Sequence, residues 1–213
     1  MGKTITNKDF QKMRFECAAF DGEWLRSFGK PELRGSWLIY GDSGSGKTTF
    51  NLRLAKYLTR FGRVGYNTIE QGACESFKNA WFGLVNMDEV GNRIVLIEKE
   101  TLAELRERLQ KRRSPDIIFI DSLHYWLGFK INDYMSLLND FPQKLFVFIA
   151  HEKGGEPKGD MAKYIRYNSD VKVHVEHFKA FVTTRFSNAE TGDGTEPYTI
   201  WAEKANEYWL NKV

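Results

Sequence analysis

Residues 41–48 read Gly41-Asp42-Ser43-Gly44-Ser45-Gly46-Lys47-Thr48, an unbroken G-x-x-x-x-G-K-[ST] motif. An apolar run over residues 37–40 precedes the motif, and a helical pattern over residues 50–58 follows it. Glycines in such a loop let consecutive backbone N–H groups turn inward and surround phosphate oxygens. A strand, a glycine-rich loop and a helix in this order predict a phosphate loop that binds a nucleoside triphosphate.

Two side chains of the motif have chemistry of their own. Lys47 is expected to reach the β- and γ-phosphate oxygens, and the hydroxyl of Thr48 is expected to bind Mg²⁺. The complete predicted nucleotide-binding set is Gly41, Asp42, Ser43, Gly44, Ser45, Gly46, Lys47, Thr48 and Thr49.

The bulk composition is that of an ordinary globular protein. The 213 residues are 42% hydrophobic and 28% charged, and we expect one domain over residues 1–213. Residues 1–35 are expected to pack on the core as helix and turn, through the aromatic side chains Phe10, Phe15, Phe20, Trp24 and Phe28. The net charge of +3 neither requires nor opposes a nucleic-acid partner.

Several features favour a cytoplasmic protein without a membrane partner. No apolar stretch approaches the roughly 18 residues that span a bilayer, and the N-terminus lacks the apolar segment of a signal peptide. Cys17 and Cys74 form no metal-binding spacing, and we expect them to be buried small side chains in a reducing compartment.

Apolar runs alternate with amphipathic segments along the first 150 residues. The runs predict strands at 36–40, 63–69, 93–97, 117–120 and 145–150. The segments between them predict helices at 47–60, 73–85, 101–113 and 133–140. Continuous apolar strands alternating with helices indicate a parallel sheet that is covered on both faces.

The last third has a different pattern. Residues 171–177, 178–186 and 198–202 predict successive strands, and residues 188–197 predict an exposed hairpin loop. The expected fold class is therefore α/β with three αβα layers, a mainly parallel central sheet and antiparallel C-terminal strands.

Two carboxylates follow predicted strands. Asp121 ends the run at 117–120, where its carboxylate is positioned to bind Mg²⁺ beside Thr48; alternatively, it caps a turn. Glu70 follows the strand at 63–69. If that strand neighbours the phosphate-loop strand, Glu70 faces the γ-phosphate and orients an attacking water, with Gln71 beside it. The alternative is a helix N-terminal glutamate that the helix dipole stabilises.

Two further side chains are candidates for catalysis. His151 ends the strand at 145–150 and precedes a glycine-rich loop, a position that suits sensing of the phosphate; a structural histidine is the alternative. Arg185 lies in the antiparallel extension, where it is either a solvated strand residue or an arginine that stabilises γ-phosphate charge in a neighbouring subunit.

Together these residues resemble the RecA-like P-loop ATPases, in particular the branch of RecA, RadA/Sms, DnaB-type helicases and KaiC-like proteins. Residues 41–48 match Walker A, Glu70 the catalytic glutamate and residues 117–122 Walker B. Residues 151–155 and 183–186 resemble the strand-end histidine loop and the Lys-x-Arg element of RadA and DnaB. Thr183 stands where that branch has lysine, which leaves Arg185 as the only candidate finger.

The resemblance implies an oligomeric, Mg²⁺-dependent ATPase that acts on single- or double-stranded DNA. Replication or recombination proteins are its expected partners, and a phage or mobile element is one expected source of the gene. It places DNA-contacting loops at 123–134 and 152–166. Their candidate contacts are Lys130, Lys153, Lys158, Lys163 and Arg166 for phosphates, and Tyr125, Trp126, Phe129, Tyr164 and Tyr167 for base stacking. The alternatives are a small-molecule or nucleotide kinase, and a non-hydrolysing switch whose ATP-bound form recruits a partner.

Overall fold

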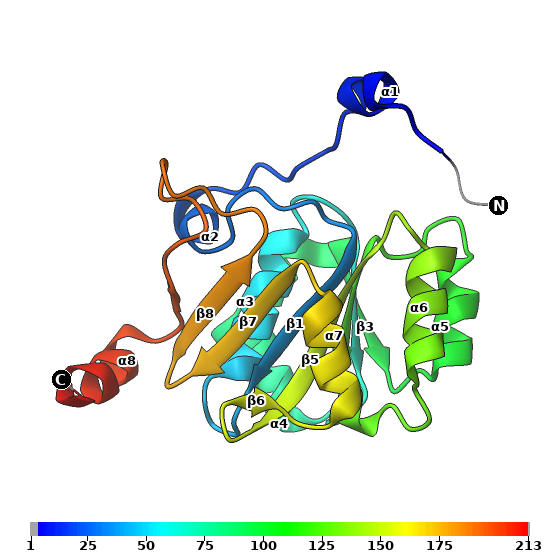
Figure 1. Cartoon of the computed structure of the whole chain (residues 1–213). Helices are drawn as coiled ribbons and strands as arrows, with labels where there is room; N and C mark the ends of the chain where they lie inside the picture. The colour runs from blue at the N-terminus through cyan, green and yellow to red at the C-terminus, as the bar shows by residue number, and fades with distance from the viewer. Residues whose placement is uncertain (1–3, 213) are drawn as a thin grey trace.

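A computed structural model describes residues 4–212, and the predictions that concern residues 1–3 and 213 lie outside this range. A nine-stranded sheet forms the centre of the molecule in the order β3-β2-β4-β5-β1-β7-β8-β9, with β6 paired to β5 (Figure 1). The parallel strands are β1 (Gly35–Gly41), β2 (Val64–Thr68), β3 (Ile94–Glu98), β4 (Ile117–Asp121), β5 (Leu145–Lys153) and β7 (Val171–Glu176). The antiparallel strands are β6 (Glu156–Pro157), β8 (Lys179–Thr184) and β9 (Tyr198–Thr199).

The helices cover both faces of the sheet. The α-helices are α1 (Asn7–Lys12), α2 (Gly22–Phe28), α3 (Lys47–Leu58), α4 (Glu75–Lys78), α5 (Leu102–Leu109), α6 (Ile131–Asp140), α7 (Asp160–Asn168) and α8 (Ala202–Trp209). A π-helix, η1 (Asn79–Leu84), continues α4, and three short 3₁₀ segments are η2 (Met87–Arg93), η3 (Leu123–Tyr125) and η4 (Leu210–Lys212).

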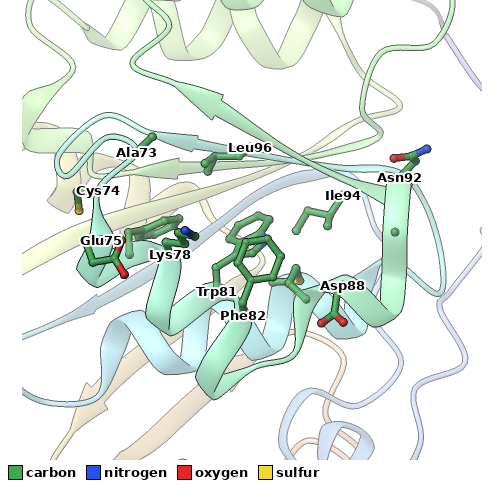
Figure 2. Close-up of a pocket in the computed structure, with 13 residues that line it drawn as sticks. Ala73, Cys74, Glu75, Lys78, Trp81, Phe82, Asp88, Asn92, Ile94 and Leu96 are labelled. Carbon is green, nitrogen blue, oxygen red and sulfur yellow. The ribbon is translucent and has the colours of Figure 1, made fainter.

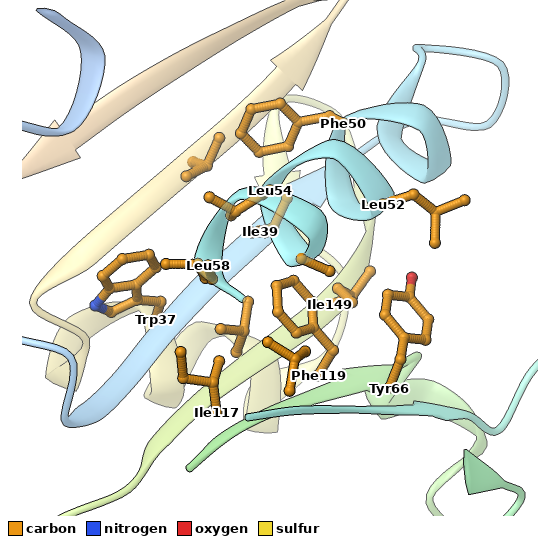
Figure 3. Close-up of a cluster of buried hydrophobic side chains, with 14 of the residues drawn as sticks. Trp37, Ile39, Phe50, Leu52, Leu54, Leu58, Tyr66, Ile117, Phe119 and Ile149 are labelled. Atoms are coloured by element: carbon orange, nitrogen blue, oxygen red, sulfur yellow. The ribbon is translucent and has the colours of Figure 1, made fainter. Parts of the chain in front are cut away.

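Two apolar clusters, one on each face, hold the layers together. Successive side chains of a strand point to opposite faces, so β1 sends Trp37 and Ile39 toward α3 (Figure 3) and Leu38 toward α7. Phe50 of α3 belongs to the first cluster, and Ile165 of α7 belongs to the second. Because both faces are buried at the centre of the sheet, β4 and the first six residues of β5 are almost continuously apolar. The predicted three-layer α/β fold with antiparallel C-terminal strands is confirmed.

The register brings the carboxyl ends of five strands to one edge of the sheet. Gly41 at the end of β1 pairs with His151 on β5 and with Val175 on β7. Thr68 at the end of β2 pairs with Asp121 at the end of β4. The loops that follow these strands therefore meet at the edge where the phosphate loop begins.

Two helices occupy segments for which the sequence predicts other structure. Residues 160–168 form α7, which buries Ala162 and Ile165 against the sheet, whereas the prediction was a loop as far as residue 166. Only Tyr198–Thr199 of the predicted strand at 198–202 is extended, and α8 follows from Ala202. Both helices are short, at nine and eight residues, and each buries only one or two side chains.

The N-terminal segment packs on the core only in its second half. α1 buries no residue and stands apart from the rest of the molecule (Figure 1), with Phe10 57% and Phe15 42% exposed. Phe20 and Phe28 are buried, and Trp24 packs beside them. The expectation that all five aromatic side chains pack on the core is therefore wrong for the first two.

Both cysteines are exposed, which corrects the prediction that they are buried. Cys17 belongs to the strand-like segment between α1 and α2, and Cys74 precedes the first turn of α4. Neither position faces one of the two apolar clusters, because each lies in a connection rather than within a packed element.

Candidate functional site

The phosphate loop joins β1 to α3, and its glycines fit requirements of the backbone. A Cβ atom on Gly41 would lie 2.3 Å from the carbonyl oxygen of Val175 on β7, so no larger residue fits. Gly46 directly precedes α3 with φ of 94°, a left-handed conformation that disfavours residues with a side chain. The loop thus delivers Lys47 at the first position of α3, where the helix dipole favours an anion.

A polar groove of about 300 Å³ opens above this loop. The residues that line it are Ser43, Gly44, Gly46, Lys47, Thr48, Thr49, Asn51, Glu70, Gln71, Asp121, His151 and Phe178. Most of the predicted phosphate-loop residues therefore share one groove with the two predicted carboxylates and the predicted histidine. Gly41, Asp42 and Ser45 belong to the loop but not to the groove lining.

Asp121 is held by a tyrosine that the sequence analysis did not single out. The hydroxyl of Tyr66, a fully buried residue on the neighbouring strand β2, donates a hydrogen bond of 2.6 Å to Oδ2 of Asp121. The pKa of Asp121 is raised to about 6, because burial, with a smaller contribution from Glu70, outweighs the Tyr66 hydroxyl and Lys47, which lower it. Such a carboxylate is costly to ionise in an empty site, and a nearby cation would relieve that cost.

Glu70 reaches the groove although the premise of its prediction is wrong. β2 does not neighbour β1, because β4 and β5 lie between them. Instead, the N–H groups of Ile69 and Glu70 both donate to the carbonyl oxygen of Asp121, at 2.6 and 3.0 Å. The end of β2 is thereby tied to the end of β4, which places Glu70 next to Asp121 and across the groove from the phosphate loop.

One hydroxyl group and one histidine position the Glu70 carboxylate. The hydroxyl of Ser122 donates to Oε2 at 2.8 Å, and Nε2 of His151 lies 3.2 Å from the same oxygen. The His151 contact is an ion pair when its ring is protonated. Within residues 4–212, no hydrogen bond or ion pair engages Oε1 of Glu70, which leaves this oxygen available to a water molecule in the groove.

A second histidine supports the first. The main-chain N–H of His151 donates to Nδ1 of His124 at 3.3 Å, and Nε2 of His124 lies 2.7 Å from the carbonyl oxygen of Lys158. Both contacts require neutral His124 with its proton on Nε2. Burial lowers the pKa of His124, which favours this neutral form. His124 therefore connects the end of β5 to the turn before α7, and no motif in the sequence marks it.

Arg185 lies at the opposite end of the sheet from the phosphate loop of its own chain. It follows Thr184 of β8, which pairs with Val171 at the start of β7, whereas the phosphate loop begins beside Val175. Its Nε lies 3.4 Å from Oδ1 of Asp170, and its side chain is 63% exposed. The structure therefore does not bring Arg185 to the other five predicted catalytic and metal-binding residues, which are Lys47, Thr48, Glu70, Asp121 and His151.

The segments predicted to contact DNA are less open than expected. Trp126 is buried, Phe129 stacks on it at 4.5 Å, and Tyr164 packs edge-on against Tyr134. Arg166 pairs with Glu156 and lies over the ring of Tyr40. Among the predicted stacking residues, Tyr125 and Tyr167 are the ones left exposed, at 51% and 81%.

A larger apolar cavity of about 720 Å³ lies beside α4, η1 and β3, at the outer strand of the sheet (Figure 2). Its walls include Phe77, Trp81, Phe82, Met87 and Leu96. None of the phosphate-loop residues lines it. This cavity is larger than the groove above the phosphate loop, but the predicted carboxylates and the predicted histidine line the smaller groove.

The oxygen ligands in the groove fit a magnesium ion that is bound together with a nucleotide. Thr48 and Asp121 supply hard oxygen atoms, which Mg²⁺ prefers. Within residues 4–212, no group of three or more His, Cys, Asp or Glu side chains could hold a metal ion. Few protein ligands are expected for Mg²⁺, because it keeps several waters and binds substrate phosphates.

The protein has a RecA-like α/β fold. Its structure is similar to that of the flagellar accessory protein FlaH from Methanocaldococcus jannaschii, with a TM-score of 0.56 over 79% of this chain and 86% of FlaH. The two sequences are 16% identical, so this similarity concerns the fold. No protein-family model and no curated protein sequence matches the chain. None of the helices in the described part of the chain is long and apolar enough to cross a membrane.

Proposed function

We propose that this protein hydrolyses ATP with Mg²⁺ at the groove above the phosphate loop. The observation that supports this proposal is the meeting of Lys47, Glu70, Asp121 and His151 in one groove, although they come from four separate elements. The assignment of ATP rather than GTP comes from the RecA-like resemblance.

Each group has a defined part in this proposal. Backbone N–H groups of the loop and the ammonium group of Lys47 hold the phosphates. The Thr48 hydroxyl and Asp121 would hold Mg²⁺, which neutralises charge on the β- and γ-phosphates. Ser122 and His151 orient the Glu70 carboxylate through Oε2, so that Oε1 accepts a proton from the attacking water. His151 is also positioned to respond to the γ-phosphate, because its bond to Glu70 lies inside the groove.

The remaining parts of the proposal concern the assembly. We propose an oligomer that acts on DNA, with Arg185 reaching the nucleotide of a neighbouring subunit. The position of Arg185 supports this arrangement, since its exposed side chain lies too far from its own phosphate loop to serve there. A measurement of particle mass with and without ATP and single-stranded DNA tests the assembly.

The Glu70→Gln variant tests the chemistry. General-base catalysis contributes about 10²- to 10⁴-fold, so phosphate release should fall by that factor while ATP binding persists. Glu75→Gln, at the exposed start of α4, is the matched control and should hydrolyse ATP at the wild-type rate. Unchanged hydrolysis in Glu70→Gln would contradict the assignment. Transfer of the γ-phosphate to an added acceptor would indicate a kinase, and tight binding without turnover would indicate a switch.

A further inference from the structure

A basic cavity of about 510 Å³ lies at the end of the sheet away from the phosphate loop. We call it the arginine cavity, and its lining residues are Thr59, Gly62, Arg63, Asn92, Arg93 and Arg113. These residues come from the connections that lead into β2, β3 and β4, that is, from the starts of strands whose other ends carry Glu70 and Asp121. Five-residue strands separate the two ends by about 16 Å. The arginine cavity is therefore distinct from the polar groove above the phosphate loop.

The three arginines of this cavity have no carboxylate partner on its walls. Within residues 4–212, none of them takes part in an ion pair. Arg63 donates from its terminal nitrogen to the carbonyl oxygen of Arg113 at 3.0 Å, and its buried Nε has no acceptor. Arg93 donates from Nε to the carbonyl oxygen of Val90 at 3.3 Å. Most N–H donors of these three guanidinium groups therefore remain available to a ligand.

One carboxylate lies behind the cavity and does not neutralise it. Oδ2 of Asp116 accepts a hydrogen bond of 2.9 Å from the main-chain N–H of Arg63. Its contact is with the backbone, and Asp116 is not part of the cavity wall. Three like charges with this one carboxylate beside them repel one another, and an anion that accepts their hydrogen bonds would relieve this repulsion. Guanidinium groups match phosphate oxygens in geometry and charge.

A second cavity extends the basic surface and indicates a polymeric ligand. It measures about 380 Å³, shares Thr59 and Arg93 with the arginine cavity, and adds Arg53, Lys56 and Arg60. In this second cavity Lys56 pairs with Glu89 and Arg60 pairs with Asp21. The cations without an ion-pair partner therefore concentrate in the arginine cavity, while two adjoining cavities with shared lining residues suit a chain of phosphates better than a single phosphate.

We propose that the arginine cavity binds the backbone phosphates of a nucleic-acid strand. This inference depends on the nucleic-acid partner in the proposed function and is independent of ATP hydrolysis. It places a contact for that partner at the starts of β2 to β4, apart from the segments at 123–134 and 152–166.

Fluorescence anisotropy with a labelled single-stranded oligonucleotide tests the proposal on the full chain. The variants Arg93→Gln and Arg113→Gln each remove one cation from the cavity wall. Arg112→Gln removes the same charge one residue away, outside the cavity, and is the matched control. Each phosphate contact adds about 0.7 to the slope of log K against log salt, so each cavity variant should bind about fivefold more weakly at 0.1 M salt.

The outcomes separate this proposal from the wider function. Selective weakening by the two cavity variants, with Arg112→Gln and the basal ATPase rate unchanged, supports it. Equal weakening by all three variants, or competition by poly-glutamate as strong as that by unlabelled oligonucleotide, overturns it. Weakening by Lys130→Gln and Lys163→Gln alone also overturns it and leaves DNA binding in place. A wild-type protein that hydrolyses ATP but binds no oligonucleotide overturns this site and the DNA partner, but not the ATPase.

Discussion

Replacement of Asp121 by asparagine should stabilise the nucleotide-free protein while it abolishes hydrolysis. Burial raises the pKa of Asp121 from 3.8 to about 6, which means that the folded protein resists ionisation of this carboxyl more than the unfolded chain does. Asparagine has nearly the same shape and stays neutral. Its side-chain oxygen can still accept the hydrogen bond from the Tyr66 hydroxyl.

The pKa shift sets both the magnitude and the pH window. A group with a raised pKa in the folded state has its full stabilising contribution below the unfolded pKa and loses it as the pH rises through the folded pKa. The shift from 3.8 to about 6 corresponds to about 3 kcal/mol. The free energy of unfolding of Asp121→Asn should therefore exceed that of the wild type by up to about 3 kcal/mol at pH 7.5. The two proteins should be equally stable near pH 4.

Urea unfolding at both pH values, without nucleotide and with a chelator, measures this difference. Asp88→Asn, at an exposed position, is the control and should change the free energy of unfolding by no more than about 0.5 kcal/mol. An Asp121→Asn variant that is no more stable than the wild type at pH 7.5 would refute the reasoning. So would a stabilisation that is the same at both pH values, because it would not come from ionisation.

Three further predictions concern individual side chains. Tyr66→Phe removes a hydroxyl that lowers the pKa of Asp121, so the acid limb of the pH profile of kcat should move to higher pH, and an unmoved limb counts against this link. In His124→Asn the amide oxygen can take the place of Nδ1 and accept from the His151 N–H, whereas in His124→Gln the amide nitrogen takes the place of Nε2 and donates to the Lys158 carbonyl, so kcat should fall more in the glutamine variant; the reverse order would contradict the proposed support. Phe28→Ala should cost about 3–5 kcal/mol of stability and Phe10→Ala within about 0.5 kcal/mol, as measured by urea unfolding, because only Phe28 is buried; similar costs would show that α1 packs on the core.

The parallel core could be predicted because its elements carry strong local signals. Continuous apolar strands such as 117–120 and 145–150 are fully buried, and the glycine-rich loop between β1 and α3 has a backbone that few sequences adopt. The structure at 152–168 could not be predicted in the same way. Pairing of Glu152 with His174 and burial of Ala162 and Ile165 are tertiary contacts, and these contacts set α7 where the glycines indicate a loop.

Site residues that end or follow a strand could be predicted from the sequence. Residues that act by holding another site residue in place could not. Glu70, Asp121 and His151 end or follow strands at one edge, so the sequence brings them together once the sheet is parallel. Tyr66 and His124 act through hydrogen bonds to side chains or backbone far away in the sequence. The prediction for Glu70 was conditional on β2 lying next to β1. The strand order shows that β4 and β5 lie between them, so Glu70 reaches the groove beside Asp121 instead.

Calorimetric titration with a non-hydrolysable ATP analogue and Mg²⁺ tests the central claim most directly. The account predicts saturable binding of one analogue per chain to the wild-type protein, and strongly weakened binding to Lys47→Ala, because this lysine stands at the first position of α3 in the phosphate groove. Lys56→Ala, which changes a lysine on the same helix outside this groove, should bind like the wild type. Absence of binding heat in the wild type, or equal affinity in Lys47→Ala, would contradict the claim that the phosphate loop holds a nucleotide.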